Sequence, residues 1–480
     1  MLLKRKLALL LAATCLLAGG CSSTPSTWRS RKAPDTGRQE EDHAGAPVIP
    51  GEERVAAAAE TEVALPTPLA CGDAERIALE RSPHLQAALS RINAAEAHVT
   101  GARAGYYPTL ELSANGTRSR QNFATINIPG VDLTSRQWSY NAALQSNWIL
   151  LDGLAREARL YGARSGLAES LAAFEDVRRL LVEAVDAAYN NALLARENIR
   201  IAEADAAFNG RLLDETRFKE EAGSASLSDR LNFEIRLNGA KSQLLQAKND
   251  RCVAEAVLFE LMGLPHPPPS AGLSLSPLDM NESRDLAPPD VETELGFALA
   301  RRPDLEGLRA AIETSECQVS ESRAASLPTL FLQGSYGYQR IDNPNFDGDD
   351  RVVSASLNLA WNLFNGFADS SVVRAAKNLT TQRRKELASR WLVVISEVRQ
   401  AATRLKTAQE QFSLQKDNLR LTSKARDLVL KEYNAGQASL VRLNEAQRDL
   451  INAEGNFALA RIAVRQLRDT LNAATSRNLF

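Results

Sequence analysis

Hydrophobic positions along this chain follow two different periods, one typical of helices and one typical of strands. In two long segments, apolar residues recur at alternating steps of three and four, which keeps them on one side of a supercoiled helix. Proline is absent between residues 154 and 221, and both proline and glycine are absent between residues 367 and 435. A helix of about 68 residues at about 1.5 Å per residue is about 100 Å long, so each segment is predicted to belong to a long helical bundle. The two stripes are Leu181, Val185, Ala188, Ala192, Ala195, Ile199, Ala202 and Ala206, and Leu387, Trp391, Val394, Val398, Ala401, Leu405, Ala408 and Phe412.

Four shorter segments alternate apolar and polar residues, as β-strands with one apolar face do. They form two predicted hairpins, at about 109–149 and about 329–364, and each hairpin contains a loop rich in turn residues. The polar positions carry Gly, Asn and Ser, and aromatic residues lie near the strand ends, which is typical of transmembrane β-strands. A soluble antiparallel sheet would show the same alternation. The aromatic residues predicted to lie at the membrane interfaces are Tyr107, Trp138, Trp148, Tyr338 and Trp361.

Four strands are too few to close a membrane barrel, because about eight is the smallest number that does so. An open sheet edge in lipid would leave backbone groups without hydrogen-bonding partners. Several chains must therefore share one barrel. Two chains would contribute about eight strands and three would contribute about twelve, and the strand pattern alone does not decide between them.

The second half of the chain repeats the first. Residues 77–110 and 297–330 align without a gap and are identical at 13 of 34 positions. Their offset of 220 residues is far longer than a solenoid period of about 20–50 residues, so each copy is a whole structural unit. We predict a tandem duplication, with a first repeat at 69–265, a linker at 266–290 and a second repeat at 291–474.

The N-terminus carries an export signal. A basic start precedes an apolar run at 7–17 and then small residues before Cys21, and this run is too short to span a bilayer. The cysteine makes the segment resemble a bacterial lipoprotein signal. That resemblance implies removal of residues 1–20, lipidation of Cys21 and, because Ser22 follows, sorting to the outer membrane. An ordinary secretory signal with a chance cysteine is the alternative. Residues 21–68, rich in small and charged residues, are predicted to form a disordered tether.

Composition excludes several functional classes. The net charge of −2 becomes −5 when the three basic residues of the signal are removed, which gives no reason to expect a nucleic-acid partner. The remaining cysteines, Cys71, Cys252 and Cys317, show no metal-binding spacing, and whether two of them form a disulfide stays open. The four histidines occur singly, without a catalytic motif, so we expect no enzyme activity, cofactor or metal. Residues 475–480 are predicted to be a frayed C-terminal tail.

After an export signal, the chain shows twice the order of helix, hairpin, long helix, glycine turn and helix. This order resembles that of the TolC-like outer-membrane factors. The specific marks are a Pro-Thr-Leu entry to both hairpins and three blocks: Arg301-Arg302-Pro303-Asp304-Leu305, Trp361 to Gly366, and Tyr433-Asn434-Ala435-Gly436. The resemblance implies a mixed fold. A homotrimer would build one shared transmembrane β-barrel from four strands per chain, continued by a long α-helical coiled-coil barrel in the periplasm. It also implies a periplasmic adaptor protein, an inner-membrane pump and outer-membrane lipid as partners.

Two glycines are predicted to turn the chain at the far end of the long helices. Gly223 and Gly436 suit the left-handed residue that ends a helix and lets the chain reverse. Ser226 can cap the next helix, with Asp229 three residues on, as in a capping box.

The resemblance places a gate at these turns. In the TolC-like pattern a Tyr–Asp contact holds the tip closed, and Tyr433 and Asp229 match its two positions. Of two acidic ring positions, Glu445 keeps its charge, whereas Arg442 stands where the family pattern has Asp. An Arg beside the Glu ring would weaken a cation-binding site, and a solvated helix surface is the alternative to a gating role for Arg442.

These features predict a passive outer-membrane exit duct of a tripartite efflux system, which carries small molecules or metals driven by an inner-membrane pump. The outlet of a type I polypeptide secretion system is the alternative. A coiled-coil scaffold at the outer membrane, whose hairpins never insert, is an alternative of another class.

Overall fold

The computed structural model describes residues 65–122, 134–223, 226–264, 273–277 and 286–479. The predicted signal peptide, Cys21 and all but the last residues of the tether lie outside these ranges. So do most of the first hairpin loop and most of the inter-repeat linker.

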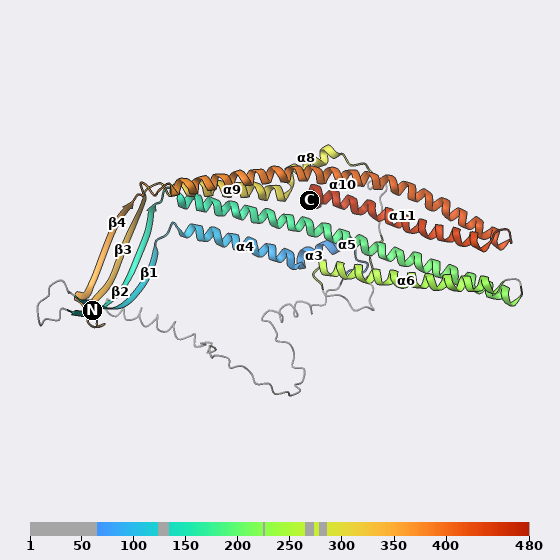
Figure 1. The fold of residues 1–480 in the computed structure, drawn as a ribbon, viewed down its shortest axis with the longest axis horizontal. Coiled ribbons are helices and arrows are strands. Elements are labelled where there is room, and N and C mark those ends of the chain that lie inside the picture. Colours follow the sequence, from blue (N-terminus) through green and yellow to red (C-terminus); the bar gives the residue numbers. More distant parts are fainter. Residues whose placement is uncertain (1–64, 123–133, 224–225, 265–272, 278–285, 480) are drawn as a thin grey trace, which may run out of the picture. The chain divides into compact units, whose positions relative to one another are not determined.

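The two halves of the chain have the same order of elements (Figure 1). In each half, two helices precede two strands, and two further helices follow them. The paired helices α4 and α9 each have 22 residues, and the paired helices α5 and α10 each have 67. The first half contains α3 (Cys71–Arg81), α4 (Pro83–Ala104), β1 (Thr109–Asn122), β2 (Thr134–Leu151), α5 (Ala155–Glu221) and α6 (Leu227–Leu261). The second contains α8 (Val291–Arg301), α9 (Pro303–Ala324), β3 (Thr329–Ile341), the short helix η2 (Gly348–Asp350), β4 (Arg351–Ala360), α10 (Ala368–Asn434), α11 (Leu440–Thr475) and η3 (Arg477–Leu479).

The four strands form one antiparallel sheet in the order β1-β2-β3-β4. The pairing of β2 with β3 joins the two hairpins, so the sheet is built by both halves together. The predicted second hairpin extends to about 364, but β4 ends at Ala360. Ala360 pairs with Thr329, the first residue of β3, so the residues beyond it have no partner strand on that side.

The long helices pack through the stripes that the sequence predicts. In α5, Val185 and Ala192 are almost fully buried, and in α10 the same holds for Val394, Val398 and Leu405. Trp391 departs from the pattern, because 43% of its surface is exposed in the single chain. Ile199, Ala206 and Leu387 are half-buried, and the remaining positions of the two stripes are buried and form the predicted helix-packing face.

Three clusters of buried apolar side chains form the core. One lies where α3, α5 and α6 meet, a second joins α8, α10 and α11, and a third lies near the ends of the long helices (Figure 1). In the first cluster Ile462 of α11 packs with residues of α3 and α5. The last helix of the second half therefore contacts the first half.

The prediction of a frayed C-terminal tail is wrong for residues 475–479. Thr475 and Ser476 are fully buried, and η3 follows them. Asn478 donates a hydrogen bond to the carbonyl oxygen of Arg179 at 2.9 Å, and Arg477 pairs with Glu294 at 2.8 Å. These contacts with α5 and α8 hold the end of the chain, whereas its sequence alone carries no strong packing signal.

Within the described residues, no helix is both long enough and apolar enough to span a lipid bilayer.

Candidate functional site

The sheet has one apolar and one polar face, as the alternating pattern predicts. Residues that pair directly across antiparallel strands point to the same face, so the register places side chains in rows that cross all four strands. One row consists of Leu112, Leu144, Tyr336 and Val353, which are all exposed. The neighbouring row, on the opposite face, consists of Glu111, Gln145, Ser335 and Ser354. A contiguous row of large apolar side chains is unfavourable in water, so this face of the sheet is expected to contact another apolar surface.

At the end of the sheet where the strands meet the helices, two Trp side chains form hydrogen bonds to the backbone. The Trp148 indole donates a hydrogen bond to the carbonyl oxygen of Tyr106 at 3.0 Å, and the Trp361 indole donates one to that of Ser326 at 3.2 Å. In each half, the Trp side chain therefore fastens the end of the hairpin to the residue two before the Pro-Thr-Leu motif. Tyr107, which follows Tyr106, is 70% exposed at the same level.

Aromatic residues also lie toward the turn end of the sheet. Trp138 stacks on Tyr140, and the Arg118 guanidinium lies 5.5 Å from the centre of the Trp138 ring. Tyr338 contacts the rings of Tyr336 and Phe346. The five aromatic residues predicted at the membrane interfaces thus form two groups, with Tyr107, Trp148 and Trp361 at one end of the sheet and Trp138 and Tyr338 toward the other.

The turns into α5 and α10 have matching backbone conformations. Gly153 and Leu154 have φ angles of 65° and 70°, and Gly366 and Phe367 have 66° and 70°. Leu154 and Phe367 are strongly exposed apolar residues in a conformation that costs an ordinary residue about 1–2 kcal/mol. The same uncommon turn therefore occurs in both halves.

The opposite ends of the long helices form the helical tip, which we define as the α5–α6 and α10–α11 turns with their flanking helix ends. Gly223 and Gly436 have φ angles of 73° and 72°, the left-handed conformation that the sequence predicts for them. Ser226 accepts a hydrogen bond from the Asp229 backbone, and the Asp229 carboxylate accepts one from the Ser226 backbone. This is the predicted capping box. The Ser439 hydroxyl oxygen caps α11 by accepting one hydrogen bond from the Arg442 backbone N–H at 3.3 Å.

The candidate gate residues lie at this tip but make fewer mutual contacts than the family pattern implies. No hydrogen bond joins Tyr433 to Asp229 within the described part of the chain. Burial, followed by the nearby charges of Asp229 and Glu215, raises the pKa of the Tyr433 hydroxyl, and Lys219 lies 5.5 Å from the centre of its ring. Tyr433 and Asp229 are therefore neighbours within one chain.

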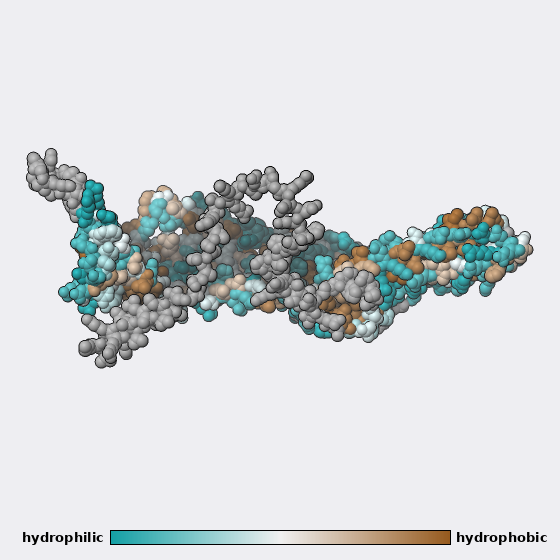
Figure 2. Space-filling view, turned by 90° about the horizontal axis from the view of Figure 1, so that it is seen from below, coloured by the Kyte–Doolittle hydropathy of each residue, from teal (hydrophilic) through white to brown (hydrophobic). Residues whose placement is uncertain are grey.

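The two ring positions are exposed. Arg442 forms an ion pair with Glu432 at 3.2 Å across the α10–α11 turn, and Glu445 lies on the surface one helical turn along α11. Apolar surface also appears on the tip, at the right-hand end of Figure 2. The exposed apolar residues of α5 and α6 near it are Phe218, Leu227, Leu231 and Ile235.

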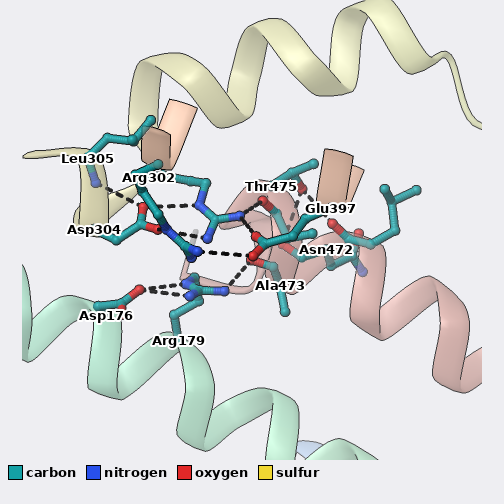
Figure 3. Close-up of polar contacts among 12 residues, drawn as sticks. Asp176, Arg179, Arg302, Asp304, Leu305, Glu397, Asn472, Ala473 and Thr475 are labelled. Atoms are coloured by element: carbon teal, nitrogen blue, oxygen red, sulfur yellow. Dashed lines mark hydrogen bonds and ion pairs between the residues drawn. The ribbon is translucent and has the colours of Figure 1, made fainter. Parts of the chain in front are cut away.

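A buried arginine network, which the sequence pattern did not predict, closes the C-terminal end of α11 (Figure 3). Arg302 is 1% exposed and bonds Asp304 at 2.8 and 3.0 Å, Glu397 at 2.6 Å and the carbonyl oxygen of Ala474 at 3.0 Å. Arg179 of α5 bonds the carbonyl oxygen of Ala473 at 2.9 Å. Cationic groups at a helix C-terminus stabilise its unpaired carbonyls. The only sequence signal was the Arg-Arg-Pro-Asp-Leu block itself, which does not show that Arg302 is buried.

Comparisons with known proteins agree with this geometry. The family model described as outer membrane efflux protein matches residues 76–264 and 295–477. Protein CyaE of Bordetella pertussis is 29% identical over 399 residues, which cover 82% of this chain and 80% of that protein. Alkaline protease secretion protein AprF of Pseudomonas aeruginosa is 27% identical over 389 residues, with coverages of 80% and 78%.

The fold is also that of solved outer-membrane channels. The Campylobacter jejuni CmeC outer membrane channel superimposes with a TM-score of 0.73 at 16% identity, covering 94% of this chain and 97% of that one. The family match covers both halves of the chain and includes the two hairpins and the long helices. The chain therefore belongs to the outer membrane efflux protein family of Gram-negative outer-membrane channels.

Proposed function

We propose that this protein is a passive exit duct through the outer membrane, in which sheets from several copies form one barrel and the helices continue it as a tunnel. The observation that carries the proposal is the two-faced sheet. Its apolar row of Leu112, Leu144, Tyr336 and Val353 would face lipid, and its polar row would face water in the lumen.

The edges of the sheet require further copies. In the described sheet β1 pairs only with β2, and β4 pairs only with β3, so each leaves one row of backbone groups unpaired. Lipid cannot satisfy such groups. Pairing β4 of one chain with β1 of the next closes the barrel by rotation. Three chains with about twelve strands agree with the family resemblance, so we propose a homotrimer.

The aromatic residues set the depth of the sheet in the membrane. Trp138 and Trp148 are ten positions apart on β2, which corresponds to about 33 Å along the strand. A strand tilted by about 40° converts this length to about 25 Å along the membrane normal, the height of a barrel's apolar band. Tyr107, Trp148 and Trp361 would lie at the periplasmic interface, and Trp138 and Tyr338 toward the outer one.

The N-terminus and the tip complete the proposal. Lipidation of Cys21 would anchor each chain to the outer membrane, and the matching halves derive from a tandem duplication. The helical tip is the periplasmic end, where Tyr433, Asp229, Arg442 and Glu445 surround the narrowest part of the duct. A periplasmic adaptor and an inner-membrane pump would supply the cargo and the energy.

Two cargo classes are supported by different observations. The family model, described as outer membrane efflux protein, supports an efflux outlet, for which we propose small molecules or metals as cargo. The similarity to AprF, a protein named for alkaline protease secretion, extends over four-fifths of the chain and supports a type I polypeptide secretion outlet. Deletion of the gene separates the two: raised drug or metal susceptibility supports efflux, whereas loss of a protein from the culture medium supports secretion.

Planar-bilayer recording of the purified protein tests the duct itself. A duct gives discrete conductance steps that disappear when an apolar sheet residue such as Leu144 is replaced by Asp. A Leu414→Asp variant on the exposed surface of α10 is the control and keeps the steps. A coiled-coil scaffold, the alternative of another class, would give no steps with any variant.

A further inference from the structure

Several acidic groups meet where α3 packs against α5 beside α11. The sulfur of Cys71 and carboxylate oxygens of Glu75 and Asp186 lie within 4.8 Å of one another. The Cys71 thiol donates a hydrogen bond to Asp186 Oδ1 at 3.1 Å. Asp186 and Asp469 are each 8% exposed, so their carboxylates are largely removed from water, whereas Cys71 and Glu75 are half-buried.

The basic groups around the cluster balance only part of this charge. The groups that face Asp186 are Cys71 and Glu75 from α3 and Asp469 from α11. Arg465 of α11 pairs with Asp469 at 3.3 Å, and Asn190 of α5 donates to the same carboxylate at 3.2 Å. Among the described residues no ion pair reaches Glu75 or Asp186. Because a second carboxylate lies this close and no cation in the described part of the chain pairs with it, the buried Asp186 favours its protonated form.

The titration behaviour of the cluster agrees with its geometry. Burial, and then a hydrogen bond to Glu75 and its charge, raise the pKa of Asp186 to about 8. Burial, followed by the charge of Asp186, raises the pKa of the Cys71 thiol above its usual range. Burial also raises the pKa of Asp469, although Arg465 opposes the shift. Every shift favours the protonated form.

We propose that a proton held by Asp186 beside Glu75 keeps α3 docked on α5, and that loss of this proton in alkaline medium releases α3. This contact matters because α3 packs against α5 and lies in an apolar cluster that also includes α11. Its buried residue Ile77 lies in the same apolar cluster as Ile462 of α11. The chain just before the helix is held as well, because the Tyr189 hydroxyl donates a hydrogen bond to the carbonyl oxygen of Leu69, two residues before α3, at 2.9 Å. Deprotonation therefore loosens the packing of α3 on α5 within the apolar cluster that also holds Ile462.

Cys71 itself reports the state of this contact. While α3 is docked, the Cys71 thiol is half-buried and donates its hydrogen bond to Asp186, so it reacts slowly with N-ethylmaleimide. Cys252 of α6 is exposed and serves as an internal reference in the same molecules. Peptide mass spectrometry gives both labelling rates in the intact protein. Because an undocked Cys71 ionises as an exposed thiol does, the ratio of the Cys71 rate to the Cys252 rate measures release of α3.

The expected result is a ratio that stays low at pH 6 and rises by about tenfold or more by pH 9.5, with a slope of at most tenfold per pH unit for one proton. Asp186→Asn keeps an oxygen acceptor for the thiol but cannot ionise, so its ratio is flat with pH. Glu75→Gln gives a second variant with the same expected result. Asp73→Asn, which removes a half-exposed carboxylate from the same helix that pairs with Arg76 and not with the cluster, behaves like the wild type.

Three results would overturn the proposal. The first is a flat ratio in the wild type, and the second is a rise that persists unchanged in both Asp186→Asn and Glu75→Gln. The third is protection of Cys71 at pH 6 that EDTA abolishes and Zn²⁺ restores, because a bound cation would then balance the charge in place of a proton.

Discussion

Replacement of Arg302 by Met tests the buried network at the end of α11. Met fills much of the same volume but makes none of the four hydrogen bonds of Arg302. It leaves Asp304 and the Ala474 carbonyl oxygen without their buried partner. Removing one member of a buried ion pair costs about 3–5 kcal/mol. The lower end of this range applies, because the Glu397 side chain is 38% exposed and regains water.

The expected change in melting temperature follows from that free energy. Unfolding entropy is about 2.1 cal/mol/K per residue near 60 °C, so about 400 ordered residues give about 0.8 kcal/mol/K. A loss of about 3 kcal/mol therefore lowers the melting temperature by about 4 °C, measured by circular dichroism of the detergent-solubilised protein. Arg301→Met is the matched control. This neighbour is exposed and lies 5.2 Å from the Phe297 ring, so its loss shifts melting by about 1 °C or less.

The pH dependence of the difference gives a second test. Burial opposes ionisation of Asp304, but the hydrogen bonds and charges of Arg302 and Arg390 outweigh it and hold the pKa of Asp304 below its usual range. A carboxylate with a lowered pKa contributes stability above its unfolded pKa of about 3.9, and that stability is lost as pH falls through the lowered value. The difference between wild type and Arg302→Met is therefore full at pH 7 and shrinks below about pH 4. Equal melting temperatures for the two proteins at pH 7 would refute the network's role.

Three further predictions concern the tip and the sheet. The double variant Tyr433→Phe with Asp229→Ala raises the closed-state current in planar bilayers, and an unchanged current would refute the gate. Gly436→Ala introduces a side chain at a φ of 72° and destabilises the tip by about 1 kcal/mol. The expected result is faster proteolysis at the α10–α11 turn. A Gly455→Ala control in the interior of α11 leaves the rate of proteolysis unchanged. Trp148→Phe removes the indole hydrogen bond to Tyr106 and lowers the yield of heat-resistant oligomer on SDS gels, and an undiminished yield would contradict the junction's role.

Local periodicity predicted most of the fold. The stripe through Val185 and Ala192 needed only the spacing of helical neighbours, and the alternation through Leu112 and Leu144 needed only the two-residue period of a strand. Ser226 and Asp229 formed their capping box because all its partners lie within four residues. These features depend on short-range geometry, which sequence alone specifies.

The features that the sequence pattern did not predict depend on contacts between segments far apart in the chain. Arg302 is buried because Glu397 and Ala474 come to it from α10 and α11. The proton-holding cluster needs Cys71 and Asp186, which are 115 positions apart. The tail at Thr475 appeared frayed for the same reason, since its partners lie in other helices. A polar residue in isolation favours the surface, and only the tertiary contacts reverse that preference.

We propose that three copies of this chain form one barrel. Native mass spectrometry of the detergent-extracted protein measures the number of copies directly. A trimeric barrel gives a single dominant species with the mass of three mature chains, held together without a covalent bond. A species with the mass of one chain, under conditions that preserve the helices, would contradict it, because the edges of β1 and β4 would then lie open in the membrane.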